Sequence, residues 1–230
     1  MSSSISPSLP PLTLSFEPTN TSNSESPTSQ SLITHLSLQP HPEGGYFAET
    51  DRDTLRIPNP FASDPRSKLV ESRSASTTIF YYLTPKSPLG HFHRNKARTV
   101  HTLHRGRGRY VLIHADEVAA GADDGDEVEE GLKWTGKARV ETFVVGQDVE
   151  SGERLQWVVE GGKYKASFLL PDEDGGGSSD GLLISETVVP GFEFSDHDFM
   201  KRDRFEALVT PEQAKEMEWM VRKGESEVMV

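Results

Sequence analysis

The residues best suited to chemistry in this 230-residue chain are two histidines, His91 and His93, in a Gly-His-Phe-His-Arg segment. Side chains alternate between the two faces of a β-strand, so both histidines would point the same way and could meet at one metal ion or one substrate. Imidazole is a common metal ligand and a general acid or base near neutral pH. A turn at Gly106 and an apolar run at 110–113 follow, which favours a strand on each side of that turn. The pattern therefore indicates a histidine site on a β-sheet.

Further histidines could complete a metal site around this pair. His101 and His104 would lie on opposite faces of a regular strand, so at most one of them could join His91 and His93 without a bulge. A divalent transition metal needs several nitrogen or oxygen ligands, and no glutamate occurs in the five residues after His93. We therefore predict no resident cofactor and keep a divalent transition metal as the alternative. The candidate metal ligands are His91, His93, His104 and His197.

Arginines follow the histidine pair at high density, although the whole chain has a formal net charge of −12. A guanidinium group repels a divalent cation but binds carboxylate and phosphate groups. The sequence therefore predicts a pocket for a small anionic metabolite, with Arg94 and Arg98 holding the anion. The alternative is that the arginines cover a sheet edge or pair with acidic loop residues. The rest of the group is Arg105, Arg107 and Arg109, and His114 is one more inward-facing candidate.

A second polar segment follows a predicted strand and contains Glu193, Asp196 and His197. A carboxylate that accepts a hydrogen bond from imidazole fixes the tautomer of the ring and raises its basicity. Asp196 or Glu193 is therefore a candidate general base or orienting group. The alternative is a turn that carries surface acids.

Short β-type runs fill the middle of the chain. They are rich in β-branched and aromatic residues and are bounded by Gly, Pro, Asp or Asn, which is typical of an antiparallel sandwich or barrel. The predicted fold class is all-β, a jelly roll whose inward strand faces line an interior ligand site. The predicted strands cover residues 46–50, 77–83, 100–103, 109–114, 139–145, 155–159, 166–170 and 182–189.

Two helices flank the predicted jelly roll. Apolar residues at helical spacing over 31–38 predict a short N-terminal helix. Thr210, Pro211 and Gln213 have the pattern of a capping box, which predicts a C-terminal helix. The predicted organisation is a flexible tail over 1–30, a domain over 31–209 with an acidic loop at 116–131 and a Gly-rich loop at 172–181, and a C-terminal helix and tail over 210–230.

The composition of the chain excludes or disfavours several classes of function. The chain contains no cysteine, which excludes a disulfide framework, a thiolate metal site and a cysteine nucleophile. Its negative charge disfavours nucleic acid and anionic membrane surfaces as partners. No segment has the pattern of a leader peptide or a membrane span, so we predict a cytoplasmic protein.

Five blocks of sequence together resemble the single-domain, sugar-epimerase-like cupin family that was first described as a domain of unknown function. They occur in the expected order from about residue 31 to residue 199. The Pro-Glu-Gly-Gly-Tyr and Phe-His-Arg motifs are the most specific. The blocks are LITHLSLQPHPEGGYFAET, SASTTIFYYLT, FHRNKARTVHTLHRG, QWVVEGGKYKASF and ETVVPGFEFSDHDF.

This resemblance implies a double-stranded β-helix with a pocket inside the barrel, commonly in a homodimer. The sequence departs from the family pattern after His93, where Arg98-Thr99 and His101-Thr102 replace an aspartate-glutamate pair and a tryptophan-histidine pair. The departure removes a carboxylate from that strand. The pocket residues that the resemblance implies are His41, Glu43, Gly44, Gly45, Tyr46, Ser76, Thr77, Thr78, His93, Arg94, Phe192, Phe194 and Asp196.

Three functions are consistent with these residues. The first is a metal-independent epimerase or isomerase of sugar-nucleotide type, in which His93 or His91 removes a proton beside a carbonyl and a tyrosine returns one. The second is a non-catalytic cupin that binds a small molecule, and the third is a metal-dependent cupin oxygenase or isomerase. The catalytic candidates are His93, His91, Asp196 and Tyr46. The ligand-binding candidates are His41, Glu43, Thr78, Tyr82, Arg94, Arg98, His104, Phe192 and Phe194.

Overall fold

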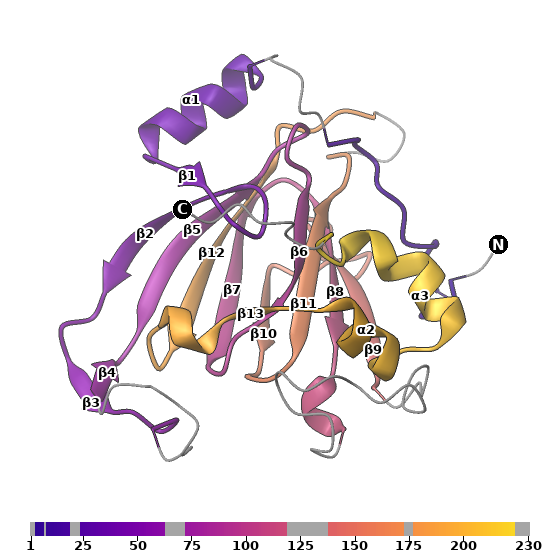
Figure 1. Cartoon of the computed structure of the whole chain (residues 1–230). Helices are drawn as coiled ribbons and strands as arrows, with labels where there is room; N and C mark the ends of the chain where they lie inside the picture. The colour runs from indigo at the N-terminus through magenta and orange to yellow at the C-terminus, as the bar shows by residue number, and fades with distance from the viewer. Residues whose placement is uncertain are drawn as a thin grey trace.

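Two antiparallel sheets face each other and form the body of the molecule (Figure 1). The computed structural model describes residues 3–6, 8–18, 24–62, 72–118, 138–172 and 177–223. The first sheet contains, in spatial order, β1 (Gln39–Pro40), β2 (Tyr46–Arg52), β5 (Thr77–Leu83), β12 (Leu182–Val189), β7 (Arg98–Arg105) and β10 (Gln156–Val159). The second contains β13 (Asp198–Phe199), β6 (Leu89–Arg94), β11 (Tyr164–Leu169), β8 (Gly108–Ile113) and β9 (Val140–Val145). A small separate pair is formed by β3 (Arg56–Pro58) and β4 (Ser72–Ser74).

Helices cover the outer faces of both sheets (Figure 1). Helix α1 (Pro27–His35) packs near Tyr82 and Leu183 on the outside of the first sheet. Helices α2 (Arg202–Leu208), α3 (Pro211–Met217) and η4 (Glu218–Met220) cover the second sheet, where Phe92 and Phe168 contribute to the same cluster. A short η1 turn (Ala115–Glu117) follows β8, and η3 (Phe194–Asp196) precedes β13.

The space between the sheets has its own apolar cluster, which contains Tyr81, Tyr110, Leu169 and Ile184. Because side chains alternate along a strand, the two clusters identify which residues point inward. On β11, for example, Tyr164 and Phe168 point to the helices, so Lys165 and Leu169 point between the sheets. The sheets therefore place a defined set of polar side chains inside the molecule.

The predicted all-β jelly roll with helices near both ends is confirmed, and so is the capping box at Thr210. The structure differs from the predicted flexible tail, because Leu12 is buried against the C-terminal helices and the amide N–H groups of Ser4 and Leu12 donate to the Glu216 carboxylate. The few apolar residues of this Ser- and Pro-rich segment are thus enough to hold part of the segment against the domain. Residues 119–131 and 173–176 of the two predicted loops lie outside the described residues.

Within the part of the chain that is described, no helix is both long enough and apolar enough to cross a membrane. The homodimer and the cytoplasmic location stay predictions.

Candidate functional site

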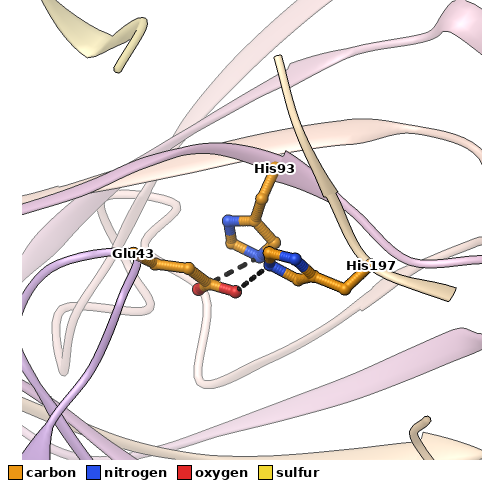
Figure 2. Close-up of side chains that lie close together, drawn as sticks. All are labelled: Glu43, His93 and His197. Atoms are coloured by element: carbon orange, nitrogen blue, oxygen red, sulfur yellow. Dashed lines mark hydrogen bonds and ion pairs between the residues drawn. The ribbon is translucent and has the colours of Figure 1, made fainter. Parts of the chain in front are cut away.

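Three side chains with metal-ligating atoms converge between the sheets: Glu43, His93 and His197 (Figure 2). Nε2 of His93 lies 3.2 Å from Oε2 of Glu43, and Nε2 of His197 lies 2.8 Å from Oε1 of the same carboxylate. The two imidazole rings stack with their centroids 5.3 Å apart. One ligand atom from each residue lies within 4.8 Å of the others. A carboxylate and two imidazoles therefore share one small volume.

The loop between β1 and β2 holds Glu43 in place through its backbone. Both the backbone N–H and Nδ1 of His91 bond to the Glu43 carbonyl oxygen, at 2.8 and 2.9 Å. The Glu43 N–H donates to Nδ1 of His41 at 3.2 Å, and the hydroxyl of Tyr81 donates to the Gly44 carbonyl at 2.9 Å. His91 and His41 thus act on the position of Glu43, while His93 meets its carboxylate.

Glycine is required directly after Glu43. Gly44 has a φ of +107°, and a Cβ there would lie 2.0 Å from the backbone oxygen of Leu89. We expect Gly44→Ala to lower the free energy of unfolding by about 2–3 kcal/mol, because strain and a backbone clash add. Gly152→Ala is the matched control, because Gly152 also has a positive φ but nothing lies within 4 Å of the added carbon. Chemical denaturation of both variants checks this, and equal losses would show that the clash is relieved without cost.

His197 reaches the site from the opposite end of the chain. The preceding residue, Asp196, forms a fully buried ion pair with Arg73 of β4, and this pair fixes the turn. The His197 ring also makes edge contacts with Phe199 at 4.9 Å and Phe192 at 6.2 Å between ring centroids. The turn that carries His197 is therefore held by charge and by aromatic packing.

The tautomer of His93 is set by its own strand. Nδ1 of His93 lies 2.9 Å from the carbonyl oxygen of His91, and a carbonyl can only accept, so Nδ1 carries the proton. In the neutral ring, Nε2 then presents a lone pair to the Glu43 carboxylate. Two hydrogen-bond acceptors at 3.2 Å need a positive species between them.

Burial decides which positive species suits this gap. It lowers the pKa of His93 to about 3, so the ring is neutral near pH 7 and a proton on Nε2 is disfavoured. Burial alone would raise the pKa of Glu43, but the interaction with His93 and the hydrogen bond from His197 outweigh it and lower that pKa to about 2. Neutral imidazole nitrogen beside an ionised carboxylate is a donor set that fits a divalent transition metal. The backbone-anchored Nδ1 of His93 is the outer hydrogen bond that metal-binding histidines usually have.

A cavity of about 250 Å³ lies beside His197. Arg94, Lys96, Asp196 and Asp198 are among its lining residues. The side chains of Glu43 and His197 retain 10% and 15% exposure, so the cluster is nearly, but not fully, shielded from solvent. Small molecules could reach the site from this side.

Several predicted ligand-binding residues lie elsewhere, because strand alternation turns them away from the interior. Arg98 is half exposed and pairs with Glu160, and exposed His104 packs on Phe80 at the outer face. The Tyr82 hydroxyl donates to the Asp180 carbonyl and bonds to the Ser29 hydroxyl near α1. Predicting that these side chains share a pocket with His93 was therefore wrong.

Other predicted residues serve the framework. The Tyr46 hydroxyl donates to Glu25, and Asp196 pairs with Arg73 instead of orienting a histidine. Phe194 is 82% exposed, while Phe192 packs near His197. The Thr78 hydroxyl bonds to the Thr187 hydroxyl on the neighbouring strand.

The arginines of the predicted cluster bond to groups near each of them. This supports the alternative that they pair with neighbouring residues instead of lining one anion pocket. Arg94 forms a two-point ion pair with Asp198 and lines the cavity. The other pairs are Arg105 with Asp180, Arg107 with Glu153, and Arg109 with the Thr142 hydroxyl and the Pro10 carbonyl. His114 meets Glu117 and Glu141.

Sequence reasoning missed a second interior cluster. Lys165 of β11 lies with Glu186 of β12 and His101 of β7 between the two sheets. The sequence indicated only that His101 and His104 lie on opposite faces of one strand, and Lys165 and Glu186 occur singly in apolar strands.

A sandwich of antiparallel sheets with inward histidines and a carboxylate agrees with the cupin class that the five sequence blocks predict. The chain belongs to the Cupin_5 family, whose model, described as Cupin superfamily (DUF985), matches residues 30–200. The family predicted from the five sequence blocks is therefore confirmed.

Similar proteins are found in distant organisms. A Saccharomyces cerevisiae protein described as uncharacterised is 43% identical over 200 residues, which are 85% of this chain and 88% of that protein. A solved structure of a hypothetical protein from Leishmania major is 27% identical with a TM-score of 0.64, and the match covers 84% of this chain and 98% of that one. A Shewanella oneidensis structure is 22% identical with a TM-score of 0.60, covering 85% and 98%.

Proposed function

We propose that this protein binds one divalent transition-metal ion through Glu43, His93 and His197 and uses the site to act on a small oxygen-rich metabolite, in a reaction of isomerase type. The observation that carries the proposal is the pair of facing acceptors, Nε2 of His93 and Oε2 of Glu43 at 3.2 Å. Neutral His93 cannot bridge them with its own proton, which is already on Nδ1. A cation satisfies both atoms at once.

The carboxylate missing from the strand of His93 is supplied by a loop, the one between β1 and β2. No glutamate occurs in the five residues after His93, which disfavoured a metal in the sequence prediction. Glu43 fills that role from the β1–β2 loop, and His91 holds it there by bonding to its backbone carbonyl. The metal set therefore differs from the predicted histidine set in two positions, with Glu43 in place of His91 and His104.

A metal ion bound here would supply Lewis-acid polarisation of a carbonyl or hydroxyl oxygen. The chain's own residues orient the ligand atoms and limit the access of water. His91 and Tyr81 fix the Glu43 loop, and Asp196 with Arg73 fixes the turn that carries His197. Prearranged ligands of this kind keep a site selective for one coordination geometry.

A second candidate uses the same groups without a metal. His93 would accept a proton from a carbon beside a carbonyl, and Glu43 would stabilise the imidazolium that forms. The observation in its favour is the direct Glu43–His93 contact. This is the metal-independent isomerase of the sequence prediction, with Glu43 as the orienting group.

Metal analysis of the purified, untagged protein separates the two candidates. We expect near-stoichiometric iron, manganese, nickel, cobalt or zinc by inductively coupled plasma mass spectrometry after reconstitution and desalting. His93→Ala should lower the retained metal at least about tenfold, because a ligand is lost. His104→Ala is the matched control, since His104 is exposed on the outer face, and it should retain metal like the wild type.

Two results would count against a metal. If the wild type retains none under these conditions, the metal-independent candidate takes its place. If His93→Ala and His104→Ala retain equal amounts, the metal binds elsewhere and the proposed site is wrong.

A further inference from the structure

A second polar cluster lies deeper between the sheets. The ammonium nitrogen of Lys165 lies 2.5 Å from Oε2 of Glu186 and 3.0 Å from Nε2 of His101. Lys165 and Glu186 belong to opposite sheets, so the ion pair crosses the interior. The three side chains are 4%, 9% and 0% exposed. This is a buried ion pair that bridges the two sheets.

The second cluster lies next to the first. Lys165 of β11 is the direct register partner of His93 on β6. Residues paired in this way in antiparallel strands project from the same face, with Cβ atoms about 5 Å apart. Lys165 also acts electrostatically on His41 and Glu43. A molecule of only a few atoms could therefore touch both clusters.

The hydrogen-bonding capacity of this cluster is only partly used. An ammonium group has more than two N–H donors, and among the described residues Lys165 has two hydrogen-bond partners. His101 must accept through Nε2, because Lys165 can only donate. Oε1 of Glu186 has no hydrogen bond to any described residue. One donor of the lysine and one acceptor of the glutamate thus remain beside each other.

A purely structural role explains this cluster poorly. A buried ion pair loses the hydration of both charges, and apolar residues of similar size often stabilise a core as well or better. The surrounding positions hold such residues, including Leu169 and Ile184. Glu186 lies in a central strand, yet its side chain keeps 9% exposure. Solvent-sized groups can therefore reach it.

We propose that Lys165 and Glu186 bind a hydroxyl group of a neutral, polyhydroxylated carbonyl compound. A hydroxyl both accepts and donates, so it can accept from Lys165 and donate to Glu186 at once. Glu186 neutralises Lys165, and its carboxylate would repel a carboxylate or phosphate brought to the same place. The proposal rests on the proposed function, because the carbonyl end of the same compound would lie at Glu43, His93 and His197. The arginines, which suggested an anionic ligand, have other partners.

The test measures binding of small probes to the full-length protein by saturation-transfer NMR and calorimetry. Dihydroxyacetone and D-erythrose are the neutral hydroxycarbonyl probes, and L-lactate is the anionic probe of similar size. We expect the neutral probes to bind more tightly than lactate. Each titration is run on zinc-loaded and on chelator-treated protein, so the result for the deeper cluster does not depend on the metal.

Two variants test the residues. Glu186→Gln keeps the shape, and Lys165→Met combined with Glu186→Gln removes both charges without leaving one unpaired. Both should bind dihydroxyacetone about tenfold or more weakly, because hydrogen bonds to charged groups are lost. Zinc stoichiometry should not change. Lys163→Met is the control, since Lys163 pairs with Asp116 outside the cluster, and it should bind the probes like the wild type.

Three results would overturn the proposal: no binding of either neutral probe to the wild type, tighter binding of lactate, or unchanged binding in folded Glu186→Gln. Failure of the wild type to retain any of the five metals would instead overturn the proposed function. The two failures are therefore distinguishable.

Discussion

Replacing Asp196 with alanine is expected to lower the free energy of unfolding by about 3–5 kcal/mol, because it leaves the charge of Arg73 buried without its partner. The Arg73 and Asp196 side chains are 0% and 1% exposed. Among the described residues, the other neighbours of the Arg73 guanidinium are Asn59, at a long hydrogen-bond distance of 3.4 Å, and the ring of Phe61 at 5.1 Å. These neighbours cannot replace a carboxylate.

The same substitution should weaken metal binding, because the buried pair of Asp196 with Arg73 fixes the turn that carries His197. Asp198→Ala is the matched control: its carboxylate lies two residues further on, pairs with Arg94 and is 43% exposed. Because the Asp198 carboxylate is in contact with solvent, its loss should cost only about 1 kcal/mol. Chemical denaturation and metal analysis of both variants test the account. A loss for Asp196→Ala as small as that for Asp198→Ala would show that the buried ion pair does not fix the turn.

Acid should destabilise the chelator-treated protein steeply below about pH 6.5. Burial lowers the pKa of His93 to about 3, far below the ordinary value of 6.5. Between those two values the unfolded chain binds a proton that the folded chain does not. Stability from this group is therefore present above about pH 6.5 and is lost as the pH falls towards 3, with a slope of up to about 1.4 kcal/mol per pH unit.

Other groups of the interior act in the same direction. Burial also lowers the pKa values of His41, His91 and His101. The pKa of Glu43 is lowered to about 2 from 4.5, so its contribution is lost between those values as the pH falls. The free energy of unfolding, measured by urea denaturation from pH 7.5 to 4.5, should be nearly constant down to about pH 6.5 and fall below it. His93→Gln should have the shallower slope, and equal slopes for both proteins would contradict a neutral buried His93.

The fold could be predicted from the sequence because its signals are local. Alternating apolar residues marked the strands, and a capping box marked the last helix. Strand alternation also placed His101 and His104 on opposite faces, but the sequence did not show which face is inward, and His104 was wrongly chosen as the inward candidate. Strand alternation did not show which of Tyr81 and Tyr82 points between the sheets. Both faces of β5 are covered, one by the opposite sheet and one by α1.

The site was only half predicted because it depends on contacts between distant segments. His93, Glu43 and His197 were each named as candidates, but not as one group, because Glu43 is 50 positions before His93 and His197 more than 100 positions after it. Spacing along one strand suggested that a carboxylate was missing, whereas the fold supplies it from a loop. The predicted anion pocket was wrong for the opposite reason, because residues close together in the sequence do not meet in the fold. Strand alternation points the arginines in different directions, and local ion pairs hold them there.

X-ray absorption spectroscopy of the zinc-loaded protein tests the central claim most directly. The account predicts scattering from two imidazole rings together with oxygen ligands, and loss of one imidazole contribution in His197→Gln with retained folding. A zinc site with no imidazole contribution, or one unchanged in His197→Gln, would contradict the assignment of Glu43, His93 and His197 as the metal centre.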